Sequence, residues 1–457
     1  MRQNKMGAEK ISRLVWSMGL PMILSMVLQA LYNVVDTMFV INMGEQGALG
    51  NLALSAAFPV QILMIAIGVG SGVGINAMLS KNLGEGNKKV VNKVAGNGIF
   101  LISVFYVLFL LFGLFLSKPY MRLMSTNETV IQMGTEYLMI CCCISIGSIG
   151  FAIAERFLMA TGKTLFSMLA QISGALVNIV LDYVFIYPLN MGIAGAAVAT
   201  VLSQIASSIW VMCHFLRKNA TLPLKLGYIK IYRPLLWGML FLGLPPFALN
   251  LVGSGVNTLY NILFRHYAPT EAIAEREIAS IGIIMTIQML LGMPVLGIAM
   301  GMQPLLGFNT GAKNYLRVRQ TFNLAAWWGG CWIFVASLLT ILFKEPIFKL
   351  FCREEMAGEL LTTGPSRLLL FFCGFQFVGY AIIVGQYFQA IGRGTISLTM
   401  SLSRQCFLLV PLMLLMPRLI GPIGIWWAAP ISDVLSIIMA FAFHMMERRR
   451  INRLLMP

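Results

Sequence analysis

The chain has 457 residues, of which 58% are hydrophobic and only 11% are charged, and its mean hydropathy is +0.81. A soluble globular protein carries about a quarter charged residues, so the composition excludes that class and indicates a protein embedded in a bilayer. The net charge of +16 arises from basic residues scattered between apolar segments. They form no single basic face, so we expect no nucleic-acid partner.

Apolar segments long enough to cross a membrane, about 20 residues each, lie between charged or Gly/Pro-rich breaks. The sequence therefore predicts an all-α integral membrane protein with twelve transmembrane helices. The predicted spans are 14–41, 52–80, 94–117, 130–159, 164–187, 192–216, 234–265, 278–308, 318–343, 361–390, 395–417 and 420–446.

Basic residues predict the orientation. If both termini lie on one side, most Lys and Arg residues fall in the segments on that side, which the positive-inside rule assigns to the cytoplasm. The first apolar span is too long for a signal peptide and lacks a small-residue cleavage site. We expect a multi-pass protein of the bacterial plasma (inner) membrane with both termini cytoplasmic.

The hydrophobic pattern occurs twice. Gly19-Leu20-Pro21 lies near the start of the first span, and Gly243-Leu244-Pro245 lies near the start of the seventh. The loop 82–87 after the second span likewise corresponds to the loop 309–314 after the eighth. A unit of roughly 225 residues repeated in this way is typical of secondary transporters, whose site lies between the halves. We predict two six-helix lobes, 1–216 and 234–457, joined by a cytoplasmic loop at 217–233.

Two polar stripes in the first half each end in a carboxylate. A buried carboxylate needs a proton, a cation or a basic partner, and oxygen-rich stripes without nearby Lys or Arg suit H⁺ or Na⁺. The simpler interpretation is an interhelical hydrogen bond, or an Asp near a helix end that reaches water. The stripes are Gln29, Asn33 and Asp36 on the first span, and Gln171, Asn178 and Asp182 on the fifth.

Other ionisable residues at membrane depth are expected to be structural. Glu155 and Arg156 are interpreted as partners in ion pairs with other helices, and Arg404 and Asp433 are expected to compensate one another.

The second half carries uncharged polar residues instead. Their positions suit hydrogen bonds to a substrate or packing between helices. The candidates for substrate contact here are Asn257 and Asn261 on the seventh span, Gln288 on the eighth and Tyr380 on the tenth.

Motifs of soluble enzymes are missing from the sequence. There is no P-loop pattern for an ATPase, and the three His residues are far apart, so we expect neither a cofactor nor an enzyme. The glycine-rich stretch 68–74 lies inside the second span, where small residues let helices approach closely.

The chain resembles the MATE family, the multidrug and toxic compound extrusion transporters, over nearly its whole length. The resemblance rests on several stretches taken together. They are Leu20-Pro21 with Asp36-Thr37, the loop 82–87, Glu155 to Gly162, Asn178 to Asp182, and Met191 to Thr200.

This resemblance implies a V of two lobes that rock between outward- and inward-facing states, exporting organic and often cationic compounds in exchange for H⁺ or Na⁺. In the branch similar to DinF and MepA, coupling is assigned to the first lobe. The matching positions are Asp36, Asn178, Asp182 and Thr200, with Gln29 nearby, Pro21 as a hinge, and Na⁺ as a candidate ligand at Asp36 and Asp182. Another branch carries acids in the seventh and tenth spans, where this chain has Asn257, Tyr260, Gln376 and Tyr380.

The residues predicted to contact substrate also include two of the first half, Asn33 and Gln171, in addition to those of the second half. The expected partners are a small organic substrate, H⁺ or Na⁺ and membrane lipids, with the chain acting as a monomer. One alternative is a flippase for lipid-linked oligosaccharides of the same superfamily, which the twelve spans and few membrane-depth Arg residues disfavour. A membrane enzyme would need catalytic groups in a sizeable loop, and the loops here are short.

Overall fold

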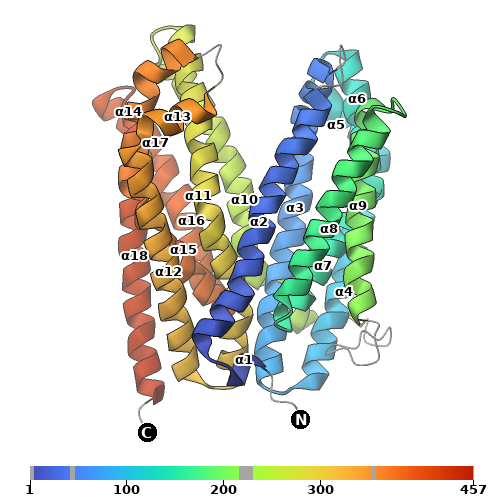
Figure 1. The fold of residues 1–457 in the computed structure, drawn as a ribbon, viewed down its shortest axis with the longest axis vertical. Helices are drawn as coiled ribbons and strands as arrows, with labels where there is room; N and C mark the ends of the chain where they lie inside the picture. The colour runs from blue at the N-terminus through green and yellow to red at the C-terminus, as the bar shows by residue number, and fades with distance from the viewer. Residues whose placement is uncertain (1–4, 42–46, 216–229, 353–356, 456–457) are drawn as a thin grey trace.

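The computed structural model describes residues 5–41, 47–215, 230–352 and 357–455, and all the regular secondary structure of these residues is helical. The helices form two groups that diverge away from the end where both described termini lie, which gives the molecule a V shape (Figure 1). We call helices α1–α9 the first lobe and α10–α18 the second lobe. The predicted all-α fold with two lobes is confirmed.

The first lobe contains α1 (Lys5–Ala8), α2 (Ile11–Ile41), α3 (Gly47–Gly84), α4 (Lys88–Leu111), η2 (Phe112–Leu116), α5 (Ser117–Met124), α6 (Glu128–Cys143), α7 (Ile146–Ala160), α8 (Thr164–Ile186) and α9 (Gly192–Phe215). The second lobe contains α10 (Arg233–Tyr267), α11 (Glu271–Gly311), α12 (Tyr315–Leu342), α13 (Lys344–Phe351), α14 (Ala357–Phe375), α15 (Val378–Ala390), α16 (Gly394–Leu402), η5 (Ser403–Leu409), α17 (Val410–Ile420) and α18 (Gly424–Leu455).

Ten helices of the described chain are long and apolar enough to cross a membrane, and the number rises to 12 if each of two bent pairs is one span. The bent pairs are α6 with α7 and α14 with α15, and each turns by 45°. They correspond to the predicted fourth and tenth spans, 130–159 and 361–390, in which the sequence marks no break. The breaks at 144–145 and 376–377 contain no Pro and no charged residue, so a search for apolar length passes over them.

The duplication is visible in backbone geometry. Asn87 caps the start of α4 by accepting a hydrogen bond from the backbone N–H of Val90, and Asn314 caps α12 in the same way from the N–H of Arg317. Gly162 and Gly392 follow equivalent helices with φ of 79° and 86°, a region that glycine enters without steric cost. The repeated sequence motifs therefore place the same turns in both lobes.

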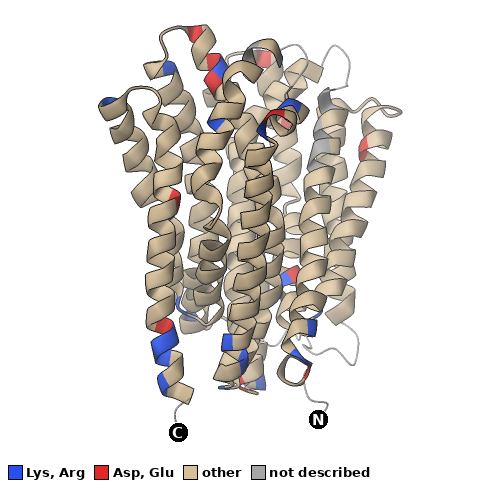
Figure 2. Cartoon of the chain, turned by 60° about the vertical axis from the view of Figure 1, so that its left-hand side comes forward, with Lys and Arg blue, Asp and Glu red and all other residues tan. Residues whose placement is uncertain are grey.

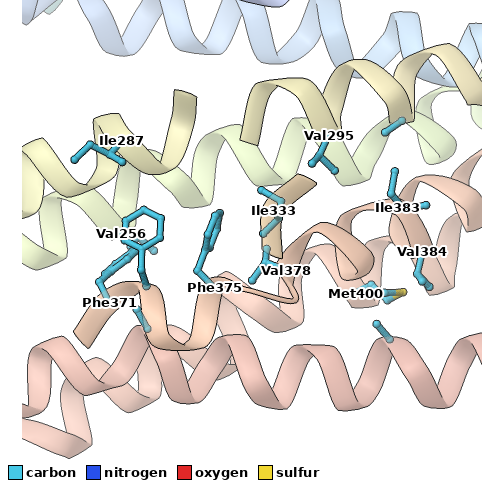
Figure 3. Packing of buried hydrophobic residues seen from close by; sticks show 14 of the residues in the cluster. Val256, Ile287, Val295, Ile333, Phe371, Phe375, Val378, Ile383, Val384 and Met400 are labelled. Atoms are coloured by element: carbon cyan, nitrogen blue, oxygen red, sulfur yellow. The ribbon is translucent and has the colours of Figure 1, made fainter. Parts of the chain in front are cut away.

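Each lobe has its own buried apolar cluster. In the second lobe, Val256 of α10, Ile287 of α11 and Phe371 of α14 belong to one cluster, which continues through α12, α15 and α16 (Figure 3). Charged residues gather near the two ends of the helices, with few between them (Figure 2). This is the distribution that a bilayer imposes, because an unpaired charge at membrane depth is costly.

Close glycine contacts join the two lobes near the end that carries the termini. A methyl group on Gly74 of α3 would lie 1.8 Å from the carbonyl oxygen of Met239 of α10, and one on Gly311 of α11 would lie 2.0 Å from the carbonyl oxygen of Lys81 of α3. We call this junction the inter-lobe seam. Its glycines are Gly19, Gly70, Gly74 and Gly84 of the first lobe and Gly243, Gly297, Gly301, Gly307 and Gly311 of the second.

The glycine-rich stretch 68–74 therefore has the packing role that the sequence predicted. Gly70 of α3 and Gly243 of α10 approach so closely that a methyl group on Gly243 would lie 2.2 Å from the carbonyl oxygen of Gly70. Gly19 and Gly301 make the corresponding contact between α2 and α11. The seam thus pairs α3 with α10 and α2 with α11, which follows the pseudo-twofold relation between the repeated halves.

Candidate functional site

The polar stripe of the fifth predicted span lies on the buried face of α8. Asn178 has 1% of its surface exposed and Asp182 has 0%. The Asn178 side-chain amide has no hydrogen-bond partner among the described residues. A carboxylate and an amide one helical turn apart, both removed from water, supply the oxygen atoms that a bound cation or proton requires.

Helix α2 packs against α8 and also touches α9, so the two predicted stripes belong to neighbouring helices. The side chains of Asn33 and Asp36 lie outside the described part of the structure. Gln29 is exposed on α2, and Thr200 is half-buried on α9. The structure brings the elements of the predicted coupling site together, while the Asp36 contact itself stays a prediction.

Glu155 belongs to α7, and its side chain contacts the face of α8 that also carries Asn178 and Asp182. Its Oε1 accepts hydrogen bonds from Ser167 Oγ and Gln171 Nε2, both at 2.5 Å. No salt bridge to Glu155 occurs among the residues that the structure describes. The expected ion pair with another helix is therefore replaced by two neutral donors, and Gln171, predicted as a substrate contact, holds this carboxylate.

A cavity of about 170 Å³ lies inside the second lobe, between α10, α11, α14, η5 and α18. Two residues predicted to contact substrate, Asn257 and Gln288, line it together with Tyr260 and Met285. Asn257 is exposed, so the cavity reaches the surface of α10. Its wall combines apolar and hydrogen-bonding groups, as in sites for small organic molecules.

An ion pair forms part of the cavity wall. Arg404 Nε donates to Asp433 Oδ1 at 2.7 Å, and the two side chains are 24% and 3% exposed. The predicted compensation of these charges is confirmed. Arg404 lies in η5, a π-helical turn, and π-helical turns are frequent at functional sites.

The other predicted substrate contacts of the second lobe lie elsewhere. Asn261 is exposed on α10, one turn beyond Asn257, and does not line the cavity. The Tyr380 hydroxyl shares a hydrogen bond with His444 Nδ1 of α18. The structure thus groups Asn257 with Gln288 and separates Tyr380 from them.

Buried amides at the inter-lobe seam were not singled out as a site from the sequence. Asn76 Nδ2 of α3 donates to Gln303 Oε1 of α11 at 3.2 Å, and Gln303 Nε2 donates to Gln389 Oε1 of α15 at 3.2 Å. Gln389 Nε2 continues the chain to the carbonyl oxygen of Leu242 of α10 at 2.8 Å. These amides lie far apart in the sequence and form no local pattern. Only the repeat, which predicts that the two halves pack against each other, could have indicated this network.

The N-terminal segment crosses to the second lobe at the same end. Arg317 of α12 donates to the backbone carbonyl oxygens of Met6 at 3.2 Å and Glu9 at 2.7 Å, and its Nε donates to Asn309 Oδ1 at 3.2 Å. Met6 is also buried beside Leu305. Together with the seam, this segment holds the lobes together at the end where the described termini lie.

Comparisons with known proteins agree with this architecture. The model of the MatE family matches residues 21–184 and 245–415. The multidrug export protein MepA of Staphylococcus saprophyticus is 22% identical over 443 residues, covering 95% of this chain and 93% of that protein. Among solved structures, a MATE crystallised in complex with MaL6 superposes with a TM-score of 0.90 at 23% identity over 99% of both chains. The MATE multidrug transporter DinF-BH, solved in complex with a ligand, gives 0.85 at 30% identity over 97% of both chains.

Proposed function

We propose that this chain, which belongs to the MatE family, is a secondary transporter that exports organic, often cationic, compounds in exchange for H⁺ or Na⁺. The observation that carries the proposal is a combination of two features. Two pseudo-symmetric lobes join at the end where the described termini lie, and a buried carboxylate, Asp182, lies on α8, which packs against α2, the helix of Asp36. MepA proteins, which resemble the chain over 95% of its length, are named as multidrug exporters.

The basic residues support an orientation in which the seam faces the cytoplasm, because the segments at this end hold most of them. The described arrangement is then closed to the cytoplasm and diverges outward. Both termini are placed on the cytoplasmic side of the bacterial plasma membrane, and residues 1–216 and 234–457 form the two moving lobes around the loop 217–233. Export requires the seam to open and the outer ends to approach.

Coupling is assigned to the first lobe. Asp36, Asn178, Asp182 and Thr200 would bind the cation, with Gln29 on the same face of α2 and Pro21 as the hinge of that helix. A cation shifts the equilibrium between two arrangements only through a difference in affinity for them. Ionised Asp36 and Asp182 repel one another when α2 and α8 lie close, and a bound proton or Na⁺ removes that repulsion, which supplies the difference.

The experiment uses purified full-length protein in proteoliposomes. Movement of the cationic dye rhodamine 6G is followed with a pH gradient and a Na⁺ gradient imposed separately. The proposal expects that one of the two gradients drives the dye against its own concentration difference. Dye that only equilibrates under both gradients would refute ion-coupled export.

A further inference from the structure

The cavity of the second lobe contains an ion pair, Arg404–Asp433, whose geometry differs from that of the Arg367–Glu277 pair in the same lobe. Arg367 holds Glu277 with two donors, Nε to Oε2 at 3.1 Å and Nη2 to Oε1 at 2.9 Å, and Trp426 Nε1 donates to Oε2 at 2.8 Å. Both oxygens of Glu277 are therefore occupied. This two-point arrangement is the strong, fixed form of an Arg–carboxylate pair.

The Arg404–Asp433 pair uses a single contact. Arg404 Nε donates to Asp433 Oδ1, while Oδ2 is buried and accepts no hydrogen bond from any described residue. The two Nη groups of Arg404 likewise donate to no described residue. One oxygen of an anionic group and both NH2 groups of a cationic group are thus left unused beside the cavity.

The surroundings keep this pair in place. Ser432 Oγ donates to the backbone carbonyl oxygen of Arg404 at 2.6 Å, which ties η5 to α18. The guanidinium lies over the Phe375 ring, 6.0 Å from its centroid. A second acceptor, Oε1 of Gln405, is also buried without a partner among the described residues and belongs to a residue that lines the same cavity.

Unused charges of both signs at one cavity are complementary to a ligand that carries both. An ammonium group can donate to Asp433 Oδ2 while a carboxylate accepts from the Arg404 Nη groups, and charge-assisted hydrogen bonds of this kind are the strong ones. A simple cation gains Asp433 but meets the positive charge of Arg404. The volume of about 170 Å³ is below the roughly 300 Å³ of a full drug-sized site, so it accepts one end of a molecule.

We propose that the second-lobe cavity binds the zwitterionic end of an organic substrate, with its ammonium on Asp433 and its carboxylate on Arg404. This rests on the proposed function for the identity of the cargo as a small organic molecule. The ion pair keeps the cavity electrically neutral when it holds no ligand, which limits the cost of leaving either charge buried. Asn257 and Gln288 supply further hydrogen bonds at the cavity.

The test measures binding to purified full-length protein in detergent, without any ion gradient. The probes are Nε-dansyl-lysine, which ends in an ammonium and a carboxylate, and dansylcadaverine, the same molecule without the carboxylate. The expected result is that wild-type protein binds dansyl-lysine at least about tenfold more tightly, as one charge-assisted hydrogen bond provides. Equal affinity for the two probes would overturn the proposal.

Two variants localise the preference. Arg404→Gln/Asp433→Asn removes both charges while keeping a polar side chain at each position, and the preference for dansyl-lysine is expected to disappear. Arg367→Gln/Glu277→Gln is the matched control, because it removes a buried pair outside the cavity, and there the preference should remain. A preference that survives in Arg404→Gln/Asp433→Asn would place the zwitterion elsewhere and overturn the proposal.

A third variant covers the case in which Arg404→Gln/Asp433→Asn fails to fold. A Cβ on Gly253 of α10 would meet only Gln405 Oε1, at 3.9 Å, so Gly253→Leu fills the cavity and leaves the ion pair intact. It should lose the preference while remaining monodisperse in gel filtration, and retention of the preference would contradict the assignment. The binding preference is measured without any gradient, so it can be observed even if gradient-driven dye export fails. Likewise, dye export can succeed if the binding preference is absent, so the two proposals are tested separately.

Discussion

Asn76 of the first lobe donates a hydrogen bond to Gln303 of the second lobe, 3.2 Å away, and both side chains are almost fully buried. The two residues are 227 positions apart in the chain. Their contact lies in the seam where glycines bring the backbones of the two lobes together. The proposed export cycle would break this hydrogen bond, so substitutions in the seam are expected to shift the equilibrium between the two arrangements of the lobes.

The variant Gly74→Ala should open the seam. Its methyl group would lie 1.8 Å from the carbonyl oxygen of Met239, so α3 and α10 must separate. We expect faster hydrogen–deuterium exchange in peptides covering 70–84 and 300–311. Helix propensity alone predicts slower exchange in this variant, because Ala stabilises a helix by about 1 kcal/mol relative to Gly.

Gly330→Ala is the control for this measurement, since a methyl group there meets nothing within 4 Å. Its exchange at the seam should equal that of wild type. Slower or unchanged exchange in Gly74→Ala would show that the seam tolerates the methyl group and does not limit opening.

Arg317→Gln should release the N-terminal segment. The variant loses the bonds to the backbone oxygens of Met6 and Glu9, which are the polar link between this segment and α12. We expect limited trypsin digestion to cut faster at Lys5, Lys10 and Arg13. Arg319→Gln serves as the control because Arg319 bonds Asn452 of α18 instead. Equal cutting in both variants would mean that the hydrogen bond from Asn309 Nδ2 to the Met6 carbonyl oxygen and the apolar burial of Met6 hold the segment without Arg317.

Pro21→Ala tests the hinge of α2. Pro21 lies inside a continuous helix and cannot donate a backbone hydrogen bond, which weakens the helix there by about 3 kcal/mol. Alanine restores the donor and should stiffen α2, so we expect slower gradient-driven efflux of rhodamine 6G with unchanged dye affinity. Wild-type efflux from this variant would mean that the proline only serves packing.

Glu277→Gln should lower stability without changing transport by the folded protein. The carboxylate accepts from Arg367 and Trp426, and removing one partner of a buried pair costs about 3–5 kcal/mol. The measurement is the melting temperature in detergent together with dye efflux per folded molecule. A normal melting temperature, or a selective loss of efflux, would contradict a purely structural role for this pair.

Much of the fold follows from apolar length and from the repeat. The predicted fifth span, 164–187, corresponds to α8 at Thr164–Ile186, and the sixth, 192–216, to α9 at Gly192–Phe215. The breaks near Ser145 and Phe377 were missed because helices there bend without proline or charge. The π-helical turn at Arg404 was missed for a similar reason, since an extra residue in a helical turn leaves no compositional signal.

The candidate sites were predictable in part. The pairing of Arg404 with Asp433 follows from two opposite charges at membrane depth, and Asn257 and Gln288 do share a cavity. That Glu155 is held by Ser167 and Gln171 could not be inferred, because neutral donors on a neighbouring helix have no pattern of their own. The open side of the Arg404–Asp433 pair depends on side-chain rotamers, which have no signal in the sequence.

If a cation at the carboxylates of the first lobe drives export, uphill transport and exchange of the dye should separate when both are measured in one preparation. Proteoliposomes of Asp36→Asn and Asp182→Asn are loaded with rhodamine 6G and assayed under whichever gradient drives the wild type. Both variants are expected to lose uphill transport yet still exchange dye between the two sides. Uphill transport at the wild-type rate in both variants would contradict it.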